Sequence, residues 1–432
     1  MQGRQVWRWL IPVALLALGL SGCGVNPVTG EREFRLISES EEIAMGEQHY
    51  EPTLQSMGGR YNADSELVAY VDEVGQRVAA ESHRPGLPYE FVVLNDGTPN
   101  AWALPGGKIA INRGLLTEME NEAELAAVLG HEIVHSAARH GAQRVERGMI
   151  MQAGVAAVGL ATQDHDFSGL LVAGASVGVG LISQRYSREA ELEADYYGTR
   201  YMAKAGYDPE AAVTLQEKFV RLAGDREPSW LEGLFASHPP SRERVQANRE
   251  TARVLREELG GEDWTLGGER YARHIRVLEE NSEAYARHDE AQQALRAKEP
   301  RRALELADAA IDAYPEEAAF HAVRGQALAR LGEKDQAITA FDAAIERNDG
   351  YFSYHLDRGL LHRVRGDDER AREDLVRSAR LLPTAPAHLA LGEMAEADGA
   401  RDAAIANYEK AASAEGFYGE RAREALSRLQ DG

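Results

Sequence analysis

The chain has 432 residues, of which 44% are hydrophobic and 27% are charged, a length that suffices for two or three globular domains. Its 70 acidic and 48 basic side chains give a formal net charge of −22. An acidic surface repels phosphate backbones, which argues against nucleic acid as a partner, and a single cysteine, Cys23, excludes an intramolecular disulfide.

The first 22 residues have the composition of an export signal. Two arginines precede the apolar stretch Leu10 to Leu20, which is too short to span a bilayer, and small residues stand before Cys23. The letters LSGC that end at Cys23 resemble the bacterial lipoprotein box, which implies a lipoprotein signal peptide at residues 1–22 and acylation of the Cys23 thiol. By the same resemblance, glycine rather than aspartate at the next position implies attachment to the outer membrane. A plain signal peptide or an uncleaved anchor is the alternative.

Two helices and a strand are predicted in the next 70 residues. The turn-forming Asn26 to Gly30 is expected to be a tether. One helix is predicted at Ser38 to Tyr50, where serines can cap acidic first-turn residues, and another at Leu67 to Ala80, where apolar residues recur at helical spacing. Tyr89 to Leu94 is rich in β-forming residues and is predicted to be a strand.

A β-hairpin is predicted around the turn letters PGG at 105–107. Trp102 to Leu104 and Lys108 to Asn112 flank this turn. We expect Lys108 to Asn112 to form an edge of the sheet, where a peptide can add through main-chain hydrogen bonds.

The next predicted helix, Glu122 to His140, carries the letters HEIVH at 131–135. Because residues i and i+4 share one face of a helix, the imidazoles of His131 and His135 point toward one spot and can bind Zn²⁺. Glu132 is then placed to act as general base on a zinc-bound water. The alternative is an amphipathic helix that happens to carry histidines. His140 is interpreted as a surface histidine.

The segment Met149 to Ile182 is rich in Ala, Gly and Val, and its only charges are two aspartates near its middle. Each of its two apolar stretches is short for a bilayer span. Three interpretations remain open: a helical hairpin packed on the core, a mobile flap that contacts substrate, or insertion into a membrane.

A third metal ligand is available on the predicted helix Ser187 to Ala205. Glu191 and Asp195 are four residues apart, so the first can bind the metal while the second accepts a hydrogen bond from a ligand histidine. Glu189 and Glu193 compete for the role, but only Glu191 has an aspartate at i+4. Two histidines and one glutamate would leave the fourth position of one zinc ion per chain open for water.

The C-terminal third contains a repeat of 33–34 residues. Small residues and bulky residues recur at this period, and four units are expected between about 283 and 417. A helix–turn–helix period of 34 residues resembles the tetratricopeptide repeat, which implies paired helices and a concave surface that binds peptides. A rigid spacer or a dimerisation platform is the alternative. The recurring positions are Gly325, Gly359 and Gly392; Ala303, Ala337, Ala371 and Ala404; and Phe341, Leu375 and Tyr408.

Five stretches, NAWALPGG, GHEIVH, ELEAD, GYDP and HPPS, resemble the gluzincin metallopeptidases of the HtpX/CAAX-prenyl-endopeptidase superfamily. Together with the repeats and the lipoprotein box, they resemble its periplasmic branch of BepA-type β-barrel assembly-enhancing proteases. The resemblance implies metal ligands at His131, His135 and Glu191 and a general base at Glu132.

The loop-like segment Pro228 to Pro240 includes His238. In the family branch, a histidine at this place can occupy the open zinc position as a self-inhibiting latch. His238 can also donate a hydrogen bond to the oxyanion of the tetrahedral intermediate, or it can be a structural histidine before the Pro-Pro turn. Arg244 is a candidate for holding this loop or for stabilising the transition state.

The sequence therefore predicts an α+β fold: a mostly helical zincin-type metallopeptidase domain with a small sheet at residues 23–265, followed by an all-α tetratricopeptide-repeat solenoid at 270–430. The expected function, by resemblance, is a periplasmic zinc endopeptidase, held at the outer membrane by a lipidated Cys23. It would degrade misfolded or stalled outer-membrane proteins and contact the β-barrel assembly machinery through its repeats. A chaperone-like assembly factor or adaptor, in which proteolysis is minor, is the alternative.

Overall fold

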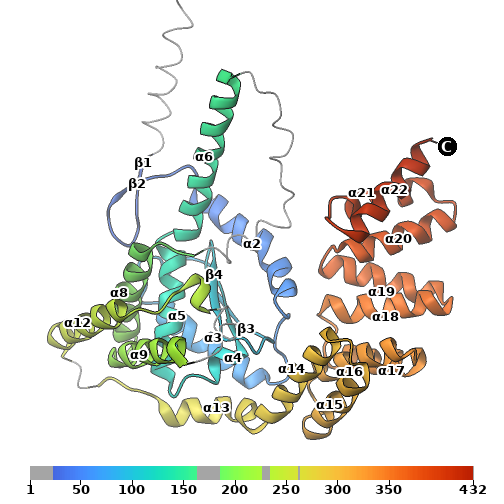
Figure 1. Cartoon of the computed structure of the whole chain (residues 1–432). Coiled ribbons are helices and arrows are strands. Elements are labelled where there is room, and N and C mark those ends of the chain that lie inside the picture. Colours follow the sequence, from blue (N-terminus) through green and yellow to red (C-terminus); the bar gives the residue numbers. More distant parts are fainter. Residues whose placement is uncertain (1–22, 163–184, 226–233, 261–262, 432) are drawn as a thin grey trace, which may run out of the picture.

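The computed structural model describes residues 23–162, 185–225, 234–260 and 263–431 (Figure 1). The expected signal peptide and the greater part of Met149 to Ile182 lie outside these residues. No helix within the described ranges combines the length and apolar character needed to cross a bilayer. The elements up to the repeats are β1 (Cys23–Val25), β2 (Arg32–Phe34), α2 (Glu39–Ser56), α3 (Ser65–Ala79), β3 (Glu90–Leu94), β4 (Ala101–Leu104), β5 (Lys108–Asn112), α4 (Arg113–Leu116), α5 (Glu122–Ala137), α6 (His140–Thr162), α8 (Arg188–Lys204), α9 (Glu210–Asp225), α11 (Leu234–Ser237), α12 (Arg242–Leu259) and α13 (Gly268–Glu280).

The expected α+β class is confirmed: a three-stranded sheet lies among many helices. The strand order is β3-β5-β4, with β3 parallel and β4 antiparallel to β5. The prediction that Lys108–Asn112 forms a sheet edge was wrong, because β5 is the central strand and β3 and β4 are the edges. The predicted hairpin indicated only β4 as a partner of β5. In the structure, β3 pairs with the other side of β5. All five residues of β5 are buried, as is expected of a central strand.

Asn26 to Gly30 is not a free tether. It forms the turn of a β1–β2 hairpin, in which Cys23 pairs with Phe34. The side chain of Asn26 donates to the carbonyl of Ala138 over 3.1 Å, and this bond fixes the turn to the end of α5.

Arg139 links the hairpin to the helices behind it. It lies between α5 and α6 with a left-handed φ of 63°, and its side chain is fully buried. Its guanidinium pairs with Glu33 on β2, Glu42 on α2 and Glu146 on α6, at 2.5, 3.3 and 3.1 Å. A buried cation with three carboxylate partners ties these four segments together.

The helices α5 and α8 meet backbone to backbone. A Cβ atom added to Gly198 would lie 2.8 Å from the carbonyl carbon of Gly130, and one added to Gly130 would lie 2.9 Å from the carbonyl oxygen of Gly198. Only glycine at both positions permits this approach. The close contact brings the facing side chains of the two helices within reach of one another.

The helix α6 rises away from the body of the protein (Figure 1). The side chains of Met149, Ile150 and Met151 are exposed. At these three positions the predicted hairpin does not pack on the core.

The repeat region consists of antiparallel helix pairs, as predicted. In the three pairs that follow the first, the recurrent glycine of the first helix faces the bulky residue of the second: Gly325 contacts the ring of Phe341, Gly359 contacts Leu375, and Gly392 contacts Tyr408. A small residue thus gives room to a large one in each of these three pairs. The helices are α14 (Ser282–Arg296), α15 (Pro300–Ala313), α16 (Ala318–Leu331), α17 (Lys334–Arg347), α18 (Phe352–Arg365), α19 (Asp368–Leu381), α20 (Ala385–Ala397), α21 (Arg401–Ala412) and α22 (Phe417–Asp431).

The first repeat shares a hydrophobic core with the sheet and with α3 and α5. Residues of α13 and α14 to α16, among them Tyr285 and Phe320, belong to the same buried cluster as the strands. The ring of Tyr285 lies 3.9 Å under the guanidinium of Arg113, and its hydroxyl donates to Glu317 over 2.9 Å.

A second contact lies one repeat further along. Gln55 at the end of α2 donates to the carbonyl of Gly350 over 2.7 Å and accepts from the amide of Phe352 over 2.9 Å. The neighbouring Tyr351 packs on Gly59. The two contacts fix the repeat array on the sheet side of the protein.

We expect Tyr285→Ala to lower the free energy of unfolding by about 3–5 kcal/mol, because it removes a buried aromatic ring and the hydroxyl that donates to Oε2 of Glu317. Tyr418→Ala, at an exposed tyrosine of α22, is the matched control and should change stability little. Urea unfolding followed by circular dichroism checks both variants, and equal losses would contradict a central role for this interface.

Gly198→Ala should lower the free energy of unfolding by about 1–3 kcal/mol, because the new methyl group forces α5 and α8 apart. Gly148→Ala on α6 meets no atom within 4 Å and should be neutral or slightly stabilising, since alanine favours a helix. Denaturant midpoints of the two variants measure the difference. An unchanged midpoint for Gly198→Ala would show that the contact tolerates a methyl group.

Candidate metal centre

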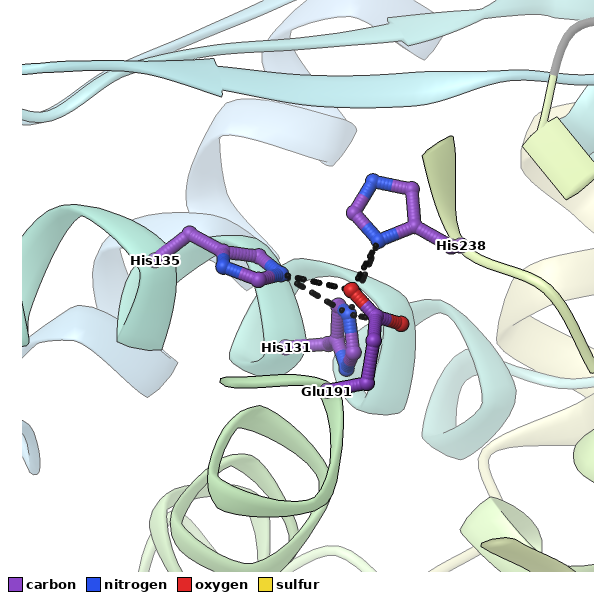
Figure 2. A group of neighbouring side chains, drawn as sticks. All are labelled: His131, His135, Glu191 and His238. Carbon is purple, nitrogen blue, oxygen red and sulfur yellow. Dashed lines mark hydrogen bonds and ion pairs between the residues drawn. The ribbon is translucent and has the colours of Figure 1, made fainter. Parts of the chain in front are cut away.

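Four buried side chains converge at the crossing of α5 and α8: His131 and His135 from α5, Glu191 from α8, and His238 from the residue after α11. One ligand atom from each lies within 4.8 Å of the others. Figure 2 shows the three imidazoles arranged around the carboxylate of Glu191. The structure therefore brings together the two histidines and the glutamate predicted as metal ligands, and adds His238 to them.

The spacing of these atoms suits a tetrahedral ion. Nε2 of His131 lies 3.1 Å from Nε2 of His135 and 3.2 Å from Nδ1 of His238. The carboxylate of Glu191 lies 3.5 Å from Nε2 of His135 and 3.0 Å from Nδ1 of His238. Ligand bonds of 2.0–2.1 Å in a tetrahedron place neighbouring ligands about 3.3 Å apart.

The Nδ1 atoms of the two helix histidines have hydrogen-bond partners on the side away from this centre. Nδ1 of His131 lies 3.0 Å from Oδ1 of Asp195, the partner predicted for it, and Nδ1 of His135 lies 2.8 Å from Nδ1 of His140. A neutral imidazole that donates through Nδ1 carries a lone pair on Nε2. Two lone pairs that face each other at 3.1 Å repel unless a cation lies between them, so the donor set fits a metal ion.

Arg244 holds the acidic side of the site. Its Nε and Nη2 donate to the two oxygens of Asp195, each over 2.7 Å, and its Nη1 lies 2.8 Å from Oε2 of Glu191. Burial disfavours the charged form of Asp195, but Arg244 and His131 together outweigh it and lower the pKa of that carboxyl. Burial likewise opposes ionisation of Glu191, yet the neighbouring histidines hold its pKa well below the usual range. Both carboxylates are therefore ionised at neutral pH.

The interpretation of His140 as a surface histidine was wrong. Its side chain is buried, and its Nε2 lies 3.4 Å from Oε1 of Glu193. Glu193, which competed with Glu191 for the ligand role, thus faces His140 rather than the candidate metal centre. No local sequence pattern predicts this burial, because it depends on the left-handed turn at Arg139, which places His140 beside His135.

Tyr186 is a residue of the site that the sequence did not indicate. Its ring stacks on the imidazole of His135 at 3.8 Å, and its amide donates to the carbonyl of Ser237 over 3.4 Å. It therefore joins a ligand on α5 to the loop that carries His238. Burial lowers the pKa of His135 well below its usual value, so this imidazole is neutral at neutral pH and able to bind a metal.

Glu132 points its carboxylate at the same space. It is buried, and its Oε2 has no hydrogen-bond partner among the described residues. Its Oε1 lies 3.6 Å from Nε2 of His238. Burial raises the pKa of Glu132, which suits a group that must accept and then release a proton.

A cavity of about 50 Å³ adjoins the donors between α5, α8, α9 and α12. Glu132 and His238 form part of its wall. The remaining wall is largely apolar and includes Val128, Leu215 and Phe219.

Comparison with known proteins gives the site its context. The model of peptidase family M48 matches residues 65–252, and that of the tetratricopeptide repeat matches residues 288–352 and 324–386. A solved thermophilic tetratricopeptide-repeat protein from Thermus thermophilus aligns over 44% of this chain and 95% of its own, at 21% identity and a TM-score of 0.31.

Two curated relatives match the peptidase region. The mitochondrial metalloendopeptidase OMA1 of Schizosaccharomyces pombe is 35% identical over 236 residues, which are 54% of this chain and 68% of the relative. The beta-barrel assembly-enhancing protease of Escherichia coli K12 is 27% identical over 237 residues, which are 53% of this chain but only 47% of the relative. With its repeats and its buried cluster of histidines and glutamate, the chain belongs to peptidase family M48 and is a metallopeptidase.

Proposed function

We propose that the protein is a zinc-dependent endopeptidase of the bacterial periplasm, held at the outer membrane by a lipidated Cys23, that degrades misfolded or stalled outer-membrane proteins and supports their assembly. The observation that carries the peptidase activity is the convergence of His131, His135 and Glu191 beside the unpartnered carboxylate oxygen of Glu132. The division into a peptidase domain at 23–265 and a repeat domain at 270–430 is part of the proposal.

The roles of the side chains follow from their positions. His131, His135 and Glu191 would hold one zinc ion, which supplies Lewis-acid polarisation and lowers the pKa of a bound water. Glu132 takes the proton of the attacking water and passes it to the leaving amine. Asp195 and His140 orient the two histidines, and Arg244 keeps Glu191 and Asp195 ionised.

The substrate class and location rest on relatives and on the N-terminal sequence. The Escherichia coli relative is named for enhancing β-barrel assembly, and the repeats give a surface on which a client or the assembly machinery can dock. The signal pattern that ends at Cys23 supports export and lipidation.

A second candidate function, a chaperone-like assembly factor that cuts rarely, is favoured by the position of His238. Its Nδ1 lies among the ligand atoms, where a fourth ligand would stand in place of water. We propose that His238 is a latch that closes the site.

Glu132→Gln should reduce kcat/KM toward an unfolded outer-membrane protein by about 10²–10⁴-fold, because the general base is lost. Its zinc content should stay near one per chain, whereas His135→Ala should lose the metal. Mass spectrometry for metal and a cleavage assay measure the two effects. If Glu132→Gln fully restores envelope integrity to a deletion strain, the assembly-factor function is correct and proteolysis is minor.

His238→Ala should raise peptidase activity, because it frees the fourth position. A hydrogen bond to a charged group, such as the one between His238 and Glu191, is worth about 1.5–3 kcal/mol, so its loss should raise activity by about 10- to 100-fold. His49→Ala on α2 is the matched control at a histidine outside the site. A fall in kcat with unchanged zinc content would instead assign His238 to the oxyanion.

A further inference from the structure

Six apolar side chains are exposed at one end of the protein, with exposed fractions from 44% for Phe34 to 72% for Met151. Three lie on or beside the β1–β2 hairpin and three on α6. We call this set the hairpin–helix patch: Val25, Phe34, Leu36, Met149, Ile150 and Met151. Exposed apolar side chains that gather in this way mark an interaction surface rather than scattered surface residues.

The two halves of the patch are fixed to each other. The carboxylate of Glu146 on α6 accepts hydrogen bonds from the amides of Leu36 and Ile37, over 3.0 and 2.9 Å. Gln143, one turn earlier, donates to Glu33 on β2 over 2.7 Å. The hairpin therefore stands against the base of α6, and both lie on the same side of the molecule (Figure 1).

The chain itself indicates what covers the patch. The apolar leader ends at Cys23, and Cys23 is the residue that pairs with Phe34 across the hairpin. An acyl chain on Cys23 would start beside an exposed phenylalanine. From Met149 to Thr162, about 20 Å of helix, α6 carries no charged residue.

The charge of this surface differs from that of the whole chain. The hairpin and the base of α6 expose Arg32 and Arg147 and half-bury Arg35, while Arg139 faces the carboxylates of Glu33 and Glu146. Glu31 is the exposed acidic residue of the hairpin. In a chain with a net charge of −22, this surface is close to charge balance, so it repels anionic lipid headgroups less than the average surface of the protein does.

We propose that the hairpin–helix patch docks on the surface of the phospholipid bilayer that holds Cys23, with Phe34 and Met151 in contact with the acyl region. The proposal rests on the proposed anchoring at Cys23 and adds an orientation to it. Lipid chains alone leave a protein free to turn, and a second apolar contact fixes one face toward the membrane.

Docking sets the height of the metal centre. His140 is the first residue of α6 and the hydrogen-bond partner of His135, and Met149 to Met151 follow 9–11 residues later. At 1.5 Å per residue, Met149 to Met151 lie about 15 Å along α6 from His140. A chain that leaves or fails to enter the bilayer would thus meet the peptidase close to the membrane surface.

Single-cysteine labelling tests the contact. Because Cys23 is the only cysteine, a chain that starts at residue 23 with Cys23→Ser offers one labelling site when Phe34→Cys or Met151→Cys is added. A polarity-sensitive dye is attached there, and an N-terminal histidine tag replaces the acyl anchor on anionic vesicles that contain nickel-chelating and brominated lipids. Matched controls carry the dye at Val364→Cys or Tyr418→Cys, which are exposed positions of the repeats.

We expect a blue shift and quenching by brominated lipid for labels at 34 and 151, and neither effect at 364 and 418. Unquenched labels at 34 and 151 would overturn the proposal, and so would a label at 151 that is already blue-shifted without vesicles, because the chain itself would then cover the patch. Zinc content and Glu132-dependent cleavage do not depend on this contact, so they report separately on the proposed peptidase function.

A second measurement uses the chain that starts at residue 23 with Cys23→Ser, without the tag. This parent chain should float with anionic vesicles, and the triple variant Met149→Gln, Ile150→Gln, Met151→Gln should float less. Phe417→Gln, at an exposed residue of α22, should float as the parent does. Equal flotation of all three proteins, or none by the parent, would contradict a bilayer-docking patch.

Discussion

The contact of Gly130 with Gly198 is the constraint on which the metal centre depends. Two helices that carry ordinary side chains pack about 8–10 Å apart, and glycine at the crossing brings side chains on the facing helices closer together. With glycine on both sides, the backbones touch, and His131, which follows Gly130, lies 3.0 Å from Asp195 on the facing helix. The candidate metal ligands are therefore positioned by two residues that offer no chemistry of their own.

A second tier of contacts holds this crossing in place. Arg244 draws Asp195 and Glu191 together from α12, and Tyr186 joins His135 to the loop that carries His238. On the opposite side, Arg139 ties the end of α5 to the hairpin, α2 and α6. These charged and aromatic contacts thus hold the helices around the centre in place without help from a metal ion.

The sequence predicted those features that depend on local spacing. The i, i+4 histidines, the pair Glu191 and Asp195, and the glycine-to-aromatic period of the repeats all reflect helix geometry, which a single segment determines. The central position of β5, the burial of His140 and the packed hairpin at Asn26 depend on partners distant in the chain. The left-handed turn at Arg139 determines the burial of His140 and the packing of the hairpin. Because arginine seldom adopts this conformation, no local pattern predicts the turn.

The interface between the repeats and the sheet has a consequence for where this architecture can work. Tyr285, Glu317, Arg113 and Gln55 hold the array by aromatic packing and hydrogen bonds, and the chain has no pair of thiols to cross-link it. The angle between the repeat array and the metallopeptidase region is thus independent of redox poise. Oxidants, reductants and disulfide isomerases, which act on cysteine pairs, leave this angle unchanged.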